Sequence, residues 1–367
     1  MKILFDHQIF SFQDYGGVSR IFYELASGIK KTNNEVIIEG RFSNNIFLPK
    51  LKKGVIPFLP NLKFPYKNYL VFYLNYFFGE KKVSQADYDL LHVTYFHPYF
   101  LNKLKGKPYV VTVYDMIHEI FSKDYKDLRN KTSVYKKEVV TKANQIIAIS
   151  ENTKKDLIKI YKIPADKINV VYLANPLDKI TPTFVHGLPK KYILFVGSRI
   201  GYDNFEFFIK SISDILRKKK DIFLVCSGGE YFSEAEKNEF TKLGISNKVV
   251  YKNFVTDGQS AYIFKKAIIY ITPTLYEGFG LQILEAFSMS CPVIASKVSS
   301  IPEVAGDAVY YIDPKNADSI NESVEMMLKN EKLRSSLVKK GKTQLMRFSW
   351  DKTVKETLRV YEKAIAD

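Results

Sequence analysis

Short apolar runs alternate with segments of helical periodicity along this chain of 367 residues. This alternation is typical of α/β domains, in which helices connect the strands of a parallel sheet, so we expect an α/β fold. The runs that predict strands lie at residues 2–6, 35–40, 90–96, 109–115 and 145–150, and then at 192–198, 222–228, 249–255, 269–273, 292–296 and 308–314.

One break interrupts the alternation. Residues 174–190 read ANPLDKITPTFVHGLPK, with three prolines, a glycine and no clear period, which is typical of a linker between domains. A chain of this length is also too long for one hydrophobic core to be expected. The sequence therefore predicts two similar α/β halves, followed from about residue 316 by three helical stretches.

Composition excludes several classes of protein. Hydrophobic residues make up 46% of the chain, which is too much for a disordered protein. The two cysteines, Cys226 and Cys291, cannot build a disulfide framework, and both are expected in packed positions of a protein from a reducing compartment. No run of about 18 apolar residues predicts a membrane span, and the N-terminus lacks the apolar stretch of a signal peptide.

The charge of the chain calls for a partner or a surface that explains it. A total of 55 Lys and Arg against 39 Asp and Glu gives a formal net charge of +16, which fits nucleic acid, an anionic membrane or phosphorylated substrates. Only eight of these residues are Arg, the residue that duplex-binding proteins favour for base edges. We therefore expect no nucleic acid partner, and we expect most Lys side chains on solvated helix faces.

The most informative segment runs from Pro273 to Glu285, after a predicted strand and into a predicted helix. Gly278 and Gly280 let the backbone approach a ligand closely, and free N–H groups at the start of the helix attract an anion such as a diphosphate. Glu277 and Glu285 would repel phosphate and instead suit neutral hydroxyl groups. Together these features describe a nucleotide sugar, whereas the alternative is a glycine-rich cap with two surface glutamates.

The segment resembles the glutamate-x7-glutamate signature of retaining glycosyltransferases of the GT-B fold, family 4. The likeness extends over TPTLYEGFGLQILEAFSMSCPVIASKVSSIPEVAGDA, and weaker likeness at GGVSR, VVTVYDMIHE, QIIAISENTKKDL and ILFVGSRIGYDNF covers both halves. The resemblance implies two Rossmann-like domains that face an interdomain cleft. It implies an acceptor-side domain at 1–178, a donor-binding domain at 179–346 and a C-terminal helix at 347–367 that returns to the first domain.

The resemblance also implies roles for individual residues. Glu277 would hold the hydroxyls of the donor sugar and act in catalysis, and Glu285 would hold the ribose. The residues of the loop that would meet sugar and diphosphate are Gly278, Phe279, Gly280 and Leu281. Val255 would lie by the nucleobase. Gly16 and Gly17 match the family's glycine loop, whose N–H groups would face the diphosphate, although they would equally suit a turn without a ligand.

Arg199 follows a strand at the place where the family has an Arg and a Lys on the diphosphate. Arg binds phosphate through paired hydrogen bonds. The expected Lys position holds Asp203, which departs from the family pattern. Either Asp203 caps the next helix, or another cation substitutes for the Lys, such as Lys265 or Lys266.

Asp115 and His118 follow the strand at 109–115, near where many relatives have a His beside the reacting carbon. Tyr114 occupies that position here. Asp115 and His118 are therefore candidate catalytic residues that would hydrogen-bond an acceptor hydroxyl or a sugar, although a lone His more often has a structural role. The resemblance implies that the acceptor proton passes to the departing phosphate oxygen, so that a dedicated base is not required.

No metal and no resident cofactor are expected beyond the nucleotide-sugar donor, linked to UDP or GDP. Asp87 and Asp89 match a metal-binding D-x-D pattern, but they precede a strand and so lie at the wrong edge of the sheet.

The segment 49–82 mixes lysines with aromatic residues and contains one acid, Glu80. Lys and aromatic side chains together are typical of proteins that bind an anionic membrane surface. The alternative is a core helix at 69–78 with a solvated basic loop before it, and a helix with one face in the core combines both interpretations. The lysines of this segment are Lys50, Lys52, Lys53, Lys63, Lys67, Lys81 and Lys82.

The leading hypothesis is a retaining, metal-independent hexosyltransferase that uses a UDP- or GDP-sugar and a glycan acceptor. That acceptor would be linked to a polyprenyl diphosphate in bacterial surface polysaccharide assembly, at the cytoplasmic face of the cell membrane. The alternatives are a GT-B transferase with a soluble acceptor and, ranked last, a basic nucleic-acid-binding protein.

Overall fold

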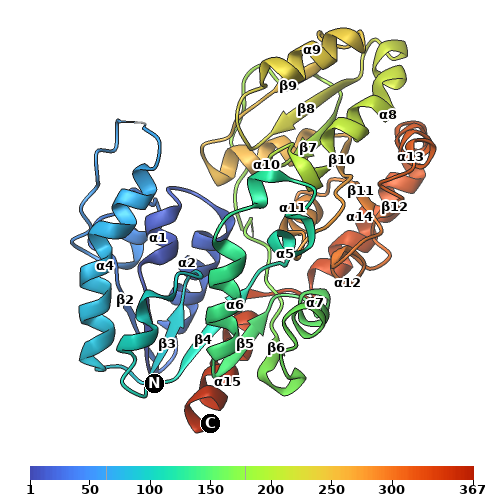
Figure 1. Ribbon diagram of the computed structural model, residues 1–367. Coiled ribbons are helices and arrows are strands. Elements are labelled where there is room, and N and C mark those ends of the chain that lie inside the picture. The colour runs from blue at the N-terminus through green and yellow to red at the C-terminus, as the bar shows by residue number, and fades with distance from the viewer. Residues whose placement is uncertain (63, 178) are drawn as a thin grey trace. The chain divides into compact units, whose positions relative to one another are not determined.

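Two compact units make up the structure, a computed structural model that describes residues 1–62, 64–177 and 179–367. The first unit contains Met1–Leu173 and Ser349–Asp367, and the second contains Ala174–Phe348. Each is built around one parallel six-stranded sheet with helices on its faces (Figure 1). The predicted α/β class with two Rossmann-like domains is therefore confirmed.

The sheet of the first unit has the strand order β2-β1-β3-β4-β5-β6. Its strands are β1 (Lys2–Phe5), β2 (Glu35–Ile38), β3 (Leu90–Val93), β4 (Tyr109–Val113), β5 (Gln145–Ala148) and β6 (Ile168–Val170). The helices are α1 (Gln8–Phe12), α2 (Gly17–Ile29), α3 (Leu48–Leu51), α4 (Lys67–Gln85), α5 (Ile117–Phe121), α6 (Thr132–Lys142), α7 (Glu151–Tyr161) and α15 (Trp350–Ala366).

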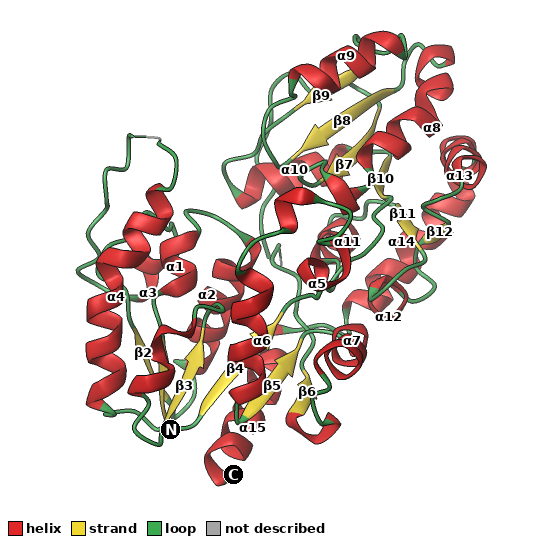
Figure 2. Cartoon of the chain, in the orientation of Figure 1, coloured by secondary structure: helices red, strands yellow, loops and turns green. Residues whose placement is uncertain are grey.

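The sheet of the second unit has the strand order β12-β11-β10-β7-β8-β9 (Figure 2). Its strands are β7 (Tyr192–Val196), β8 (Phe223–Ser227), β9 (Val249–Tyr251), β10 (Ile269–Thr272), β11 (Val293–Ser296) and β12 (Tyr310–Ile312). The helices are α8 (Phe205–Lys218), α9 (Glu234–Lys242), α10 (Asp257–Lys266), α11 (Leu281–Ser288), α12 (Ile301–Ala305), α13 (Ala317–Lys329) and α14 (Glu331–Leu345).

Local sequence signals account for most of these elements. Every predicted strand is present. The helix α7 begins after Ser150, whose hydroxyl accepts a hydrogen bond from the Thr153 N–H at 3.0 Å and so caps the helix. The strand β6 and the short helix α1 were not predicted. Both are too short to carry a recognisable periodicity.

The C-terminal helix α15 belongs to the first unit, where it packs against α2 and against β3, β4 and β5. Its Tyr361 hydroxyl is hydrogen-bonded to Nδ1 of the fully buried His92 on β3, at 2.6 Å. The other ring nitrogen of His92 is hydrogen-bonded to Thr112 on β4, at 2.9 Å. One buried imidazole therefore connects two strands of the sheet to the last helix of the chain.

Cys226 and Cys291 are free and buried, in agreement with their predicted packing role. Burial raises the pKa of both thiols far above the ordinary value. No helix in the described parts of the chain is long and apolar enough to cross a bilayer.

Candidate active site

The loop that leads from β10 to α11 lies at the point where the strand order of the second sheet reverses. β10 pairs with β7 on one side and β11 on the other, so the loops after β7 and β10 leave the same sheet edge in different directions. Open α/β sheets bind ligands at such a point, outside the carboxyl ends of the strands. Residues 273–280 therefore occupy the position in this unit that is best suited to a ligand.

The backbone of Glu277 is held from both sides by two serines that follow β11. Its N–H donates to Ser299 Oγ, and its carbonyl accepts from Ser300 Oγ, both at 2.8 Å. No role was predicted for these serines, although their position after the strand next to β10 was a usable signal. Fixing the backbone at Glu277 limits where its half-buried carboxylate can point.

A second set of hydrogen bonds holds the first half of this loop against the loop after β7. The Leu275 N–H donates to the Tyr202 carbonyl at 2.8 Å, and the Thr274 hydroxyl donates to the same carbonyl at 3.0 Å. The Asn204 amide donates to the carbonyls of Pro273, at 3.0 Å, and Pro314, at 2.8 Å. The loop is therefore part of a rigid layer at the sheet edge.

The start of α11 has the geometry of an anion site. Gly280 precedes the helix with a φ of +94°, a conformation that favours glycine. The first turn of α11 has no acidic side chain, and its N–H groups carry the partial positive charge of the helix end. Gly278, Phe279 and Gly280 are buried and Leu281 is half-buried, so a ligand here would be partly screened from water.

Three carboxylates lie near enough to Tyr270 on β10 for their negative charge to act on its hydroxyl. Burial is the main cause that raises the pKa of Tyr270, and the negative charges of Glu277, Glu285 and Asp203 raise it further. Glu277 and Glu285 are both half-buried, as befits groups that receive hydrogen bonds from a bound ligand. The structure thus brings together the two glutamates that the sequence selected, along with the aspartate that replaces the expected lysine.

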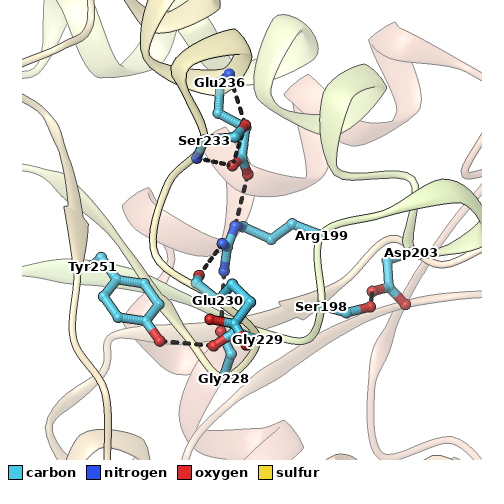
Figure 3. Close-up of polar contacts among 9 residues, drawn as sticks. All are labelled: Ser198, Arg199, Asp203, Gly228, Gly229, Glu230, Ser233, Glu236 and Tyr251. Atoms are coloured by element: carbon cyan, nitrogen blue, oxygen red, sulfur yellow. Dashed lines mark hydrogen bonds and ion pairs between the residues drawn. The ribbon is translucent and has the colours of Figure 1, made fainter. Parts of the chain in front are cut away.

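Arg199 is turned inward, toward the protein (Figure 3). Its guanidinium donates to Glu236 Oε1 at 2.8 Å, to the Gly228 carbonyl at 3.0 Å and to the Glu230 carbonyl. It also lies over the rings of Phe232, at 5.1 Å, and Tyr251, at 5.5 Å, and its side chain is only 2% exposed. Each nitrogen of the guanidinium has a protein partner, which holds Arg199 in this orientation, and its contact with a diphosphate stays a prediction.

This cluster fixes the loop after β8. The Tyr251 hydroxyl donates to the Gly229 carbonyl at 2.8 Å, and Gly229, with a φ of +63°, lies so close to Ser198 that a Cβ there would be 3.0 Å from the Ser198 Cα. Hydrogen bonds from Ser233 and Arg199 outweigh the effect of burial and lower the pKa of Glu236. The ion pair with Arg199 therefore involves an ionised carboxylate.

Asp203 does not cap α8, because the residue before that helix is Asn204 and its side chain makes no cap. The Asp203 carboxylate instead accepts from the Ser198 hydroxyl and from backbone N–H groups of residues 198–200. Burial nevertheless raises its pKa. The oxygens of Asp203 are thus hydrogen-bonded within their own loop.

The expectation that Lys265 or Lys266 replaces the missing cation is wrong. Both lie in the last turn of α10, which leads into the amino end of β10. The glutamate loop leaves the opposite, carboxyl end of the same strand. A helix that returns the chain to the start of a strand places its last turn at the wrong edge of the sheet.

Val255 is 74% exposed in the loop between β9 and α10, and its N–H donates to the Gln259 side chain at 2.9 Å. In the first unit, Gly16 precedes α2 in an extended conformation and Gly17 begins the helix. The Gln13 side chain accepts from the Ser19 N–H, at 3.2 Å, in the first turn. The ligand contacts assigned to Val255, Gly16 and Gly17 stay predictions.

Asp115 and His118 belong to a charged cluster at the carboxyl end of β4. The buried Lys136 ammonium lies 3.0 Å from Glu119 and 3.8 Å from the Asp115 carboxylate, and it also donates to the Asp115 carbonyl at 3.0 Å. The Tyr161 hydroxyl donates to Glu119 at 2.6 Å. Sequence reasoning missed Lys136 and Tyr161, because α6 and α7 bring them to this site from elsewhere in the chain.

The imidazole of His118 is kept neutral by its surroundings. Burial first, and then the charge of Lys136, lower its pKa. Within the described residues, its buried Nδ1 has no hydrogen-bond partner. A neutral imidazole has one nitrogen that donates and one that accepts, so it can hydrogen-bond to a hydroxyl group, as the predicted role requires. That role stays a prediction.

The D-x-D pair lies at the amino edge of the first sheet. Lys82 Nζ lies 2.9 Å from Asp87, and the Lys2 N–H donates to Asp89 at 2.7 Å. Among residues 1–62, 64–177 and 179–367, no group of three or more His, Cys, Asp or Glu is arranged to hold a metal ion.

Comparison with known families and structures places this geometry in context. Residues 179–344 match the family described as glycosyl transferases group 1, and residues 15–178 match glycosyltransferase family 4. The chain is 30% identical over 236 residues to the uncharacterized glycosyltransferase MJ1607 of Methanocaldococcus jannaschii, with 60% of each chain covered. It is 27% identical over 236 residues to O-antigen chain mannosyltransferase B of Escherichia coli, with 61% of this chain and 62% of the relative covered.

The match thus spans about three fifths of the length of these two relatives. The fold is similar over almost the whole chain to that of HepE from Anabaena, solved in complex with UDP and glucose, with a TM-score of 0.72, 16% identity and 99% of each chain covered. The two parallel six-stranded sheets agree with this fold. The family matches together run from residue 15 to residue 344 and include the glutamate loop at the switch point of the second sheet. This chain belongs to the group 1 glycosyltransferases, family 4, and has the GT-B fold.

Proposed function

We propose that this protein transfers a hexose-type sugar from a nucleotide donor to a glycan acceptor. The observation that carries the proposal is the pairing of Glu277 and Glu285, both half-buried, around the start of α11. Helix N–H groups suit the diphosphate of the donor, and the two carboxylates suit the hydroxyls of its sugar and its ribose. A nucleotide sugar has this order of groups.

The proposed donor is a UDP- or GDP-sugar. HepE, which shares the fold, was solved with UDP and glucose, and the E. coli relative is named a mannosyltransferase. Since Arg199 is paired with protein groups, we assign the charge of the diphosphate first to the N–H groups of α11. Gly16 and Gly17 are the second source of N–H donors in the proposal.

The proposed acceptor is a glycan of bacterial surface polysaccharide assembly, attached to a polyprenyl diphosphate at the cytoplasmic face of the membrane. The name of the E. coli relative, which refers to the O-antigen chain, supports this class of acceptor. Asp115 and His118 are the proposed contacts for the attacking hydroxyl. A soluble glycan is the alternative acceptor, and it would be used without any lipid.

The proposed chemistry retains the anomeric configuration and uses no divalent cation. The bond from the anomeric carbon to the diphosphate oxygen breaks, and a bond to the acceptor oxygen forms on the same face. The acceptor proton passes to the departing diphosphate oxygen, so no side chain has to act as a base. The N–H groups of α11 stabilise the charge that develops on the leaving group.

Thermal unfolding with UDP, GDP, UDP-glucose and GDP-mannose tests the donor site. A ligand that binds only the native state raises the unfolding temperature in proportion to ln(1+[L]/Kd), so the correct donor is expected to stand out. Glu285→Gln is expected to weaken the response to every nucleotide, because it alters the ribose contact. Glu322→Gln is the matched control, because Glu322 is exposed on α13 of the same unit.

Release of nucleoside diphosphate from the donor so identified tests the reaction. Glu277→Gln is expected to lower this rate by about a hundredfold or more while the unfolding temperature stays within a degree or two. Full activity of Glu277→Gln would refute the site. Loss of activity in EDTA that is restored only by a divalent cation would refute the proposed chemistry.

A further inference from the structure

The helix α4 has an apolar surface on the side that faces away from the core of its unit. Tyr69, Leu70, Tyr73 and Phe77 recur at helical spacing along this side, and Tyr73 and Phe77 are 62% and 68% exposed. The opposite side is buried through residues such as Val71, Phe72, Asn75 and Val83. A surface helix normally presents polar side chains to water, so this side is suited to an apolar partner.

The loop before α4 is held in a fixed conformation and exposes two more apolar side chains. Lys67 is buried, and its ammonium donates to the carbonyls of Leu59, at 2.7 Å, and Leu62, at 3.0 Å. The side chains of Leu59 and Leu62 are left 46% and 56% exposed. We call Leu59, Leu62, Tyr69, Leu70, Tyr73 and Phe77 the α4 surface, after the helix that Figure 1 labels.

The segment that contains the α4 surface also contains lysines with exposed charge, but fewer than the sequence suggested. Lys67 is hydrogen-bonded to the backbone of the loop and Lys82 pairs with Asp87, so neither contributes free charge. Lys63 lies outside the described residues. Lys53 and Lys81 are exposed and Lys52 is half-buried, and the described part of the chain gives none of the three an acidic partner within 4 Å. Lys81 follows Phe77 by one helical turn on the same side of α4.

We propose that the α4 surface inserts into the interface of an anionic lipid bilayer, with Lys52, Lys53 and Lys81 at the headgroups. Tyr and Phe side chains are suited to the boundary between headgroups and acyl chains, and each nearby Lys strengthens binding to anionic lipid. A second copy of this chain is a poorer fit, because a two-fold contact would bring the same lysines face to face.

This proposal rests on exposed side chains and charge and does not depend on the identity of the sugar. It deepens the proposed function, because a surface that holds the first unit at a bilayer would bring an acceptor linked to lipid within reach. Binding to vesicles and donor turnover are separate measurements, so the two proposals can fail separately.

Co-sedimentation with vesicles of phosphatidylcholine, with and without phosphatidylglycerol, tests the proposal on the full chain. The wild-type protein is expected to bind the anionic vesicles and to bind the neutral ones much less. Tyr73→Ser with Phe77→Ser is expected to reduce binding to anionic vesicles at least tenfold. Lys52→Glu, Lys53→Glu and Lys81→Glu together are expected to reduce it by about a hundredfold or more.

Two matched variants control for lost hydrophobicity and lost charge. Val134→Ser with Met346→Ser removes two side chains that are 65% and 78% exposed elsewhere. Lys332→Glu, Lys339→Glu and Lys342→Glu, all exposed on α14, change the net charge by the same amount as the test variant. Both controls are expected to bind anionic vesicles as the wild-type protein does.

Absence of wild-type binding, or equal binding by test and control variants, would overturn the proposal. Gel filtration tests the alternative that a second copy of this chain binds the α4 surface. The wild-type protein could be a dimer, and the variant Tyr73→Ser with Phe77→Ser a monomer that still binds vesicles. In that case the α4 surface is an interface between copies, and the proposal is wrong. Far-UV circular dichroism and the unfolding temperature confirm that each variant is folded.

Discussion

Arg199 shows how one side chain can take a role that its position in the chain does not suggest. At the end of β7 it lies where a diphosphate ligand is expected, yet it spans to Gly228, Glu230 and Glu236 and is almost fully buried. A buried guanidinium is costly to leave unpaired, and removing one partner of a buried ion pair strongly destabilises a protein. Its first role in this structure is therefore to hold two loops together.

Replacing Arg199 with Met is expected to lower the free energy of unfolding by about 3 kcal/mol, because it leaves Glu236 and two carbonyls without their partner. Glu236→Gln is expected to cost less, and the double variant less than the sum, because both residues belong to one network. Urea unfolding without nucleotide measures these values. Arg347→Met, at an exposed position of the same unit, is the control.

The opposite result would restore the role predicted from the sequence. If Arg199 serves only the donor, Arg199→Met leaves the stability of the nucleotide-free protein unchanged and weakens only the binding of UDP or GDP.

At the scale of elements, the glutamate loop depends on its neighbours in the sheet. The loops after β7 and β11 lie on either side of it and supply hydrogen bonds from Asn204, Ser299 and Ser300. Sheet order therefore sets the position of Glu277, and that order brings together strands that are far apart in the chain. Only the pairing of β10 with β7 and β11 places these loops side by side.

Ser299→Ala with Ser300→Ala removes both hydrogen bonds to the Glu277 backbone. We expect turnover to fall by roughly tenfold to a hundredfold, because a small displacement of a positioned group strongly slows a reaction. The loss of stability is expected to be only about 1–2 kcal/mol. The rate of nucleoside diphosphate release measures the effect, and Ser335→Ala with Ser336→Ala, exposed on α14, is the control. Unchanged turnover would show that the clamp does not position Glu277.

At the scale of the whole molecule, acid stability follows from buried histidines in the first unit. Burial lowers the pKa of His92 and of His7 to about 3, whereas both titrate near 6.5 when unfolded. Below pH 6.5 the unfolded chain therefore binds protons that the folded chain does not. Stability is lost as the pH falls from 6.5 toward 3 and is fully present above 6.5.

Each histidine is expected to contribute a slope of about 1.4 kcal/mol per pH unit in this range. Urea unfolding between pH 8 and pH 5, followed by the fluorescence of the single tryptophan, Trp350 at the start of α15, measures the slope. His92→Gln is expected to reduce it by the share of one histidine, and His186→Gln, at an exposed position, is expected to leave it unchanged. An equal slope in His92→Gln and the wild-type protein would contradict the assignment.

The α/β class, the predicted strands and the two-part architecture could all be predicted from the sequence alone. Periodicity, capping and turn residues act over a few neighbouring residues, so their effects can be recognised without knowing the rest of the chain. The same locality led to the Glu277–Glu285 segment, because a strand, a glycine loop and a helix start follow one another there.

The partner of each long polar side chain could not be predicted in this way, because it depends on the tertiary fold. Arg199 turns to residues 29 to 37 positions away, and Lys67, expected at the surface, is buried under its own loop. Lys136 joins the cluster at Asp115 because α6 packs beside the end of β4. A charged side chain is stable only where its charge is solvated or paired, and which of these occurs depends on groups that the fold brings together from distant parts of the chain.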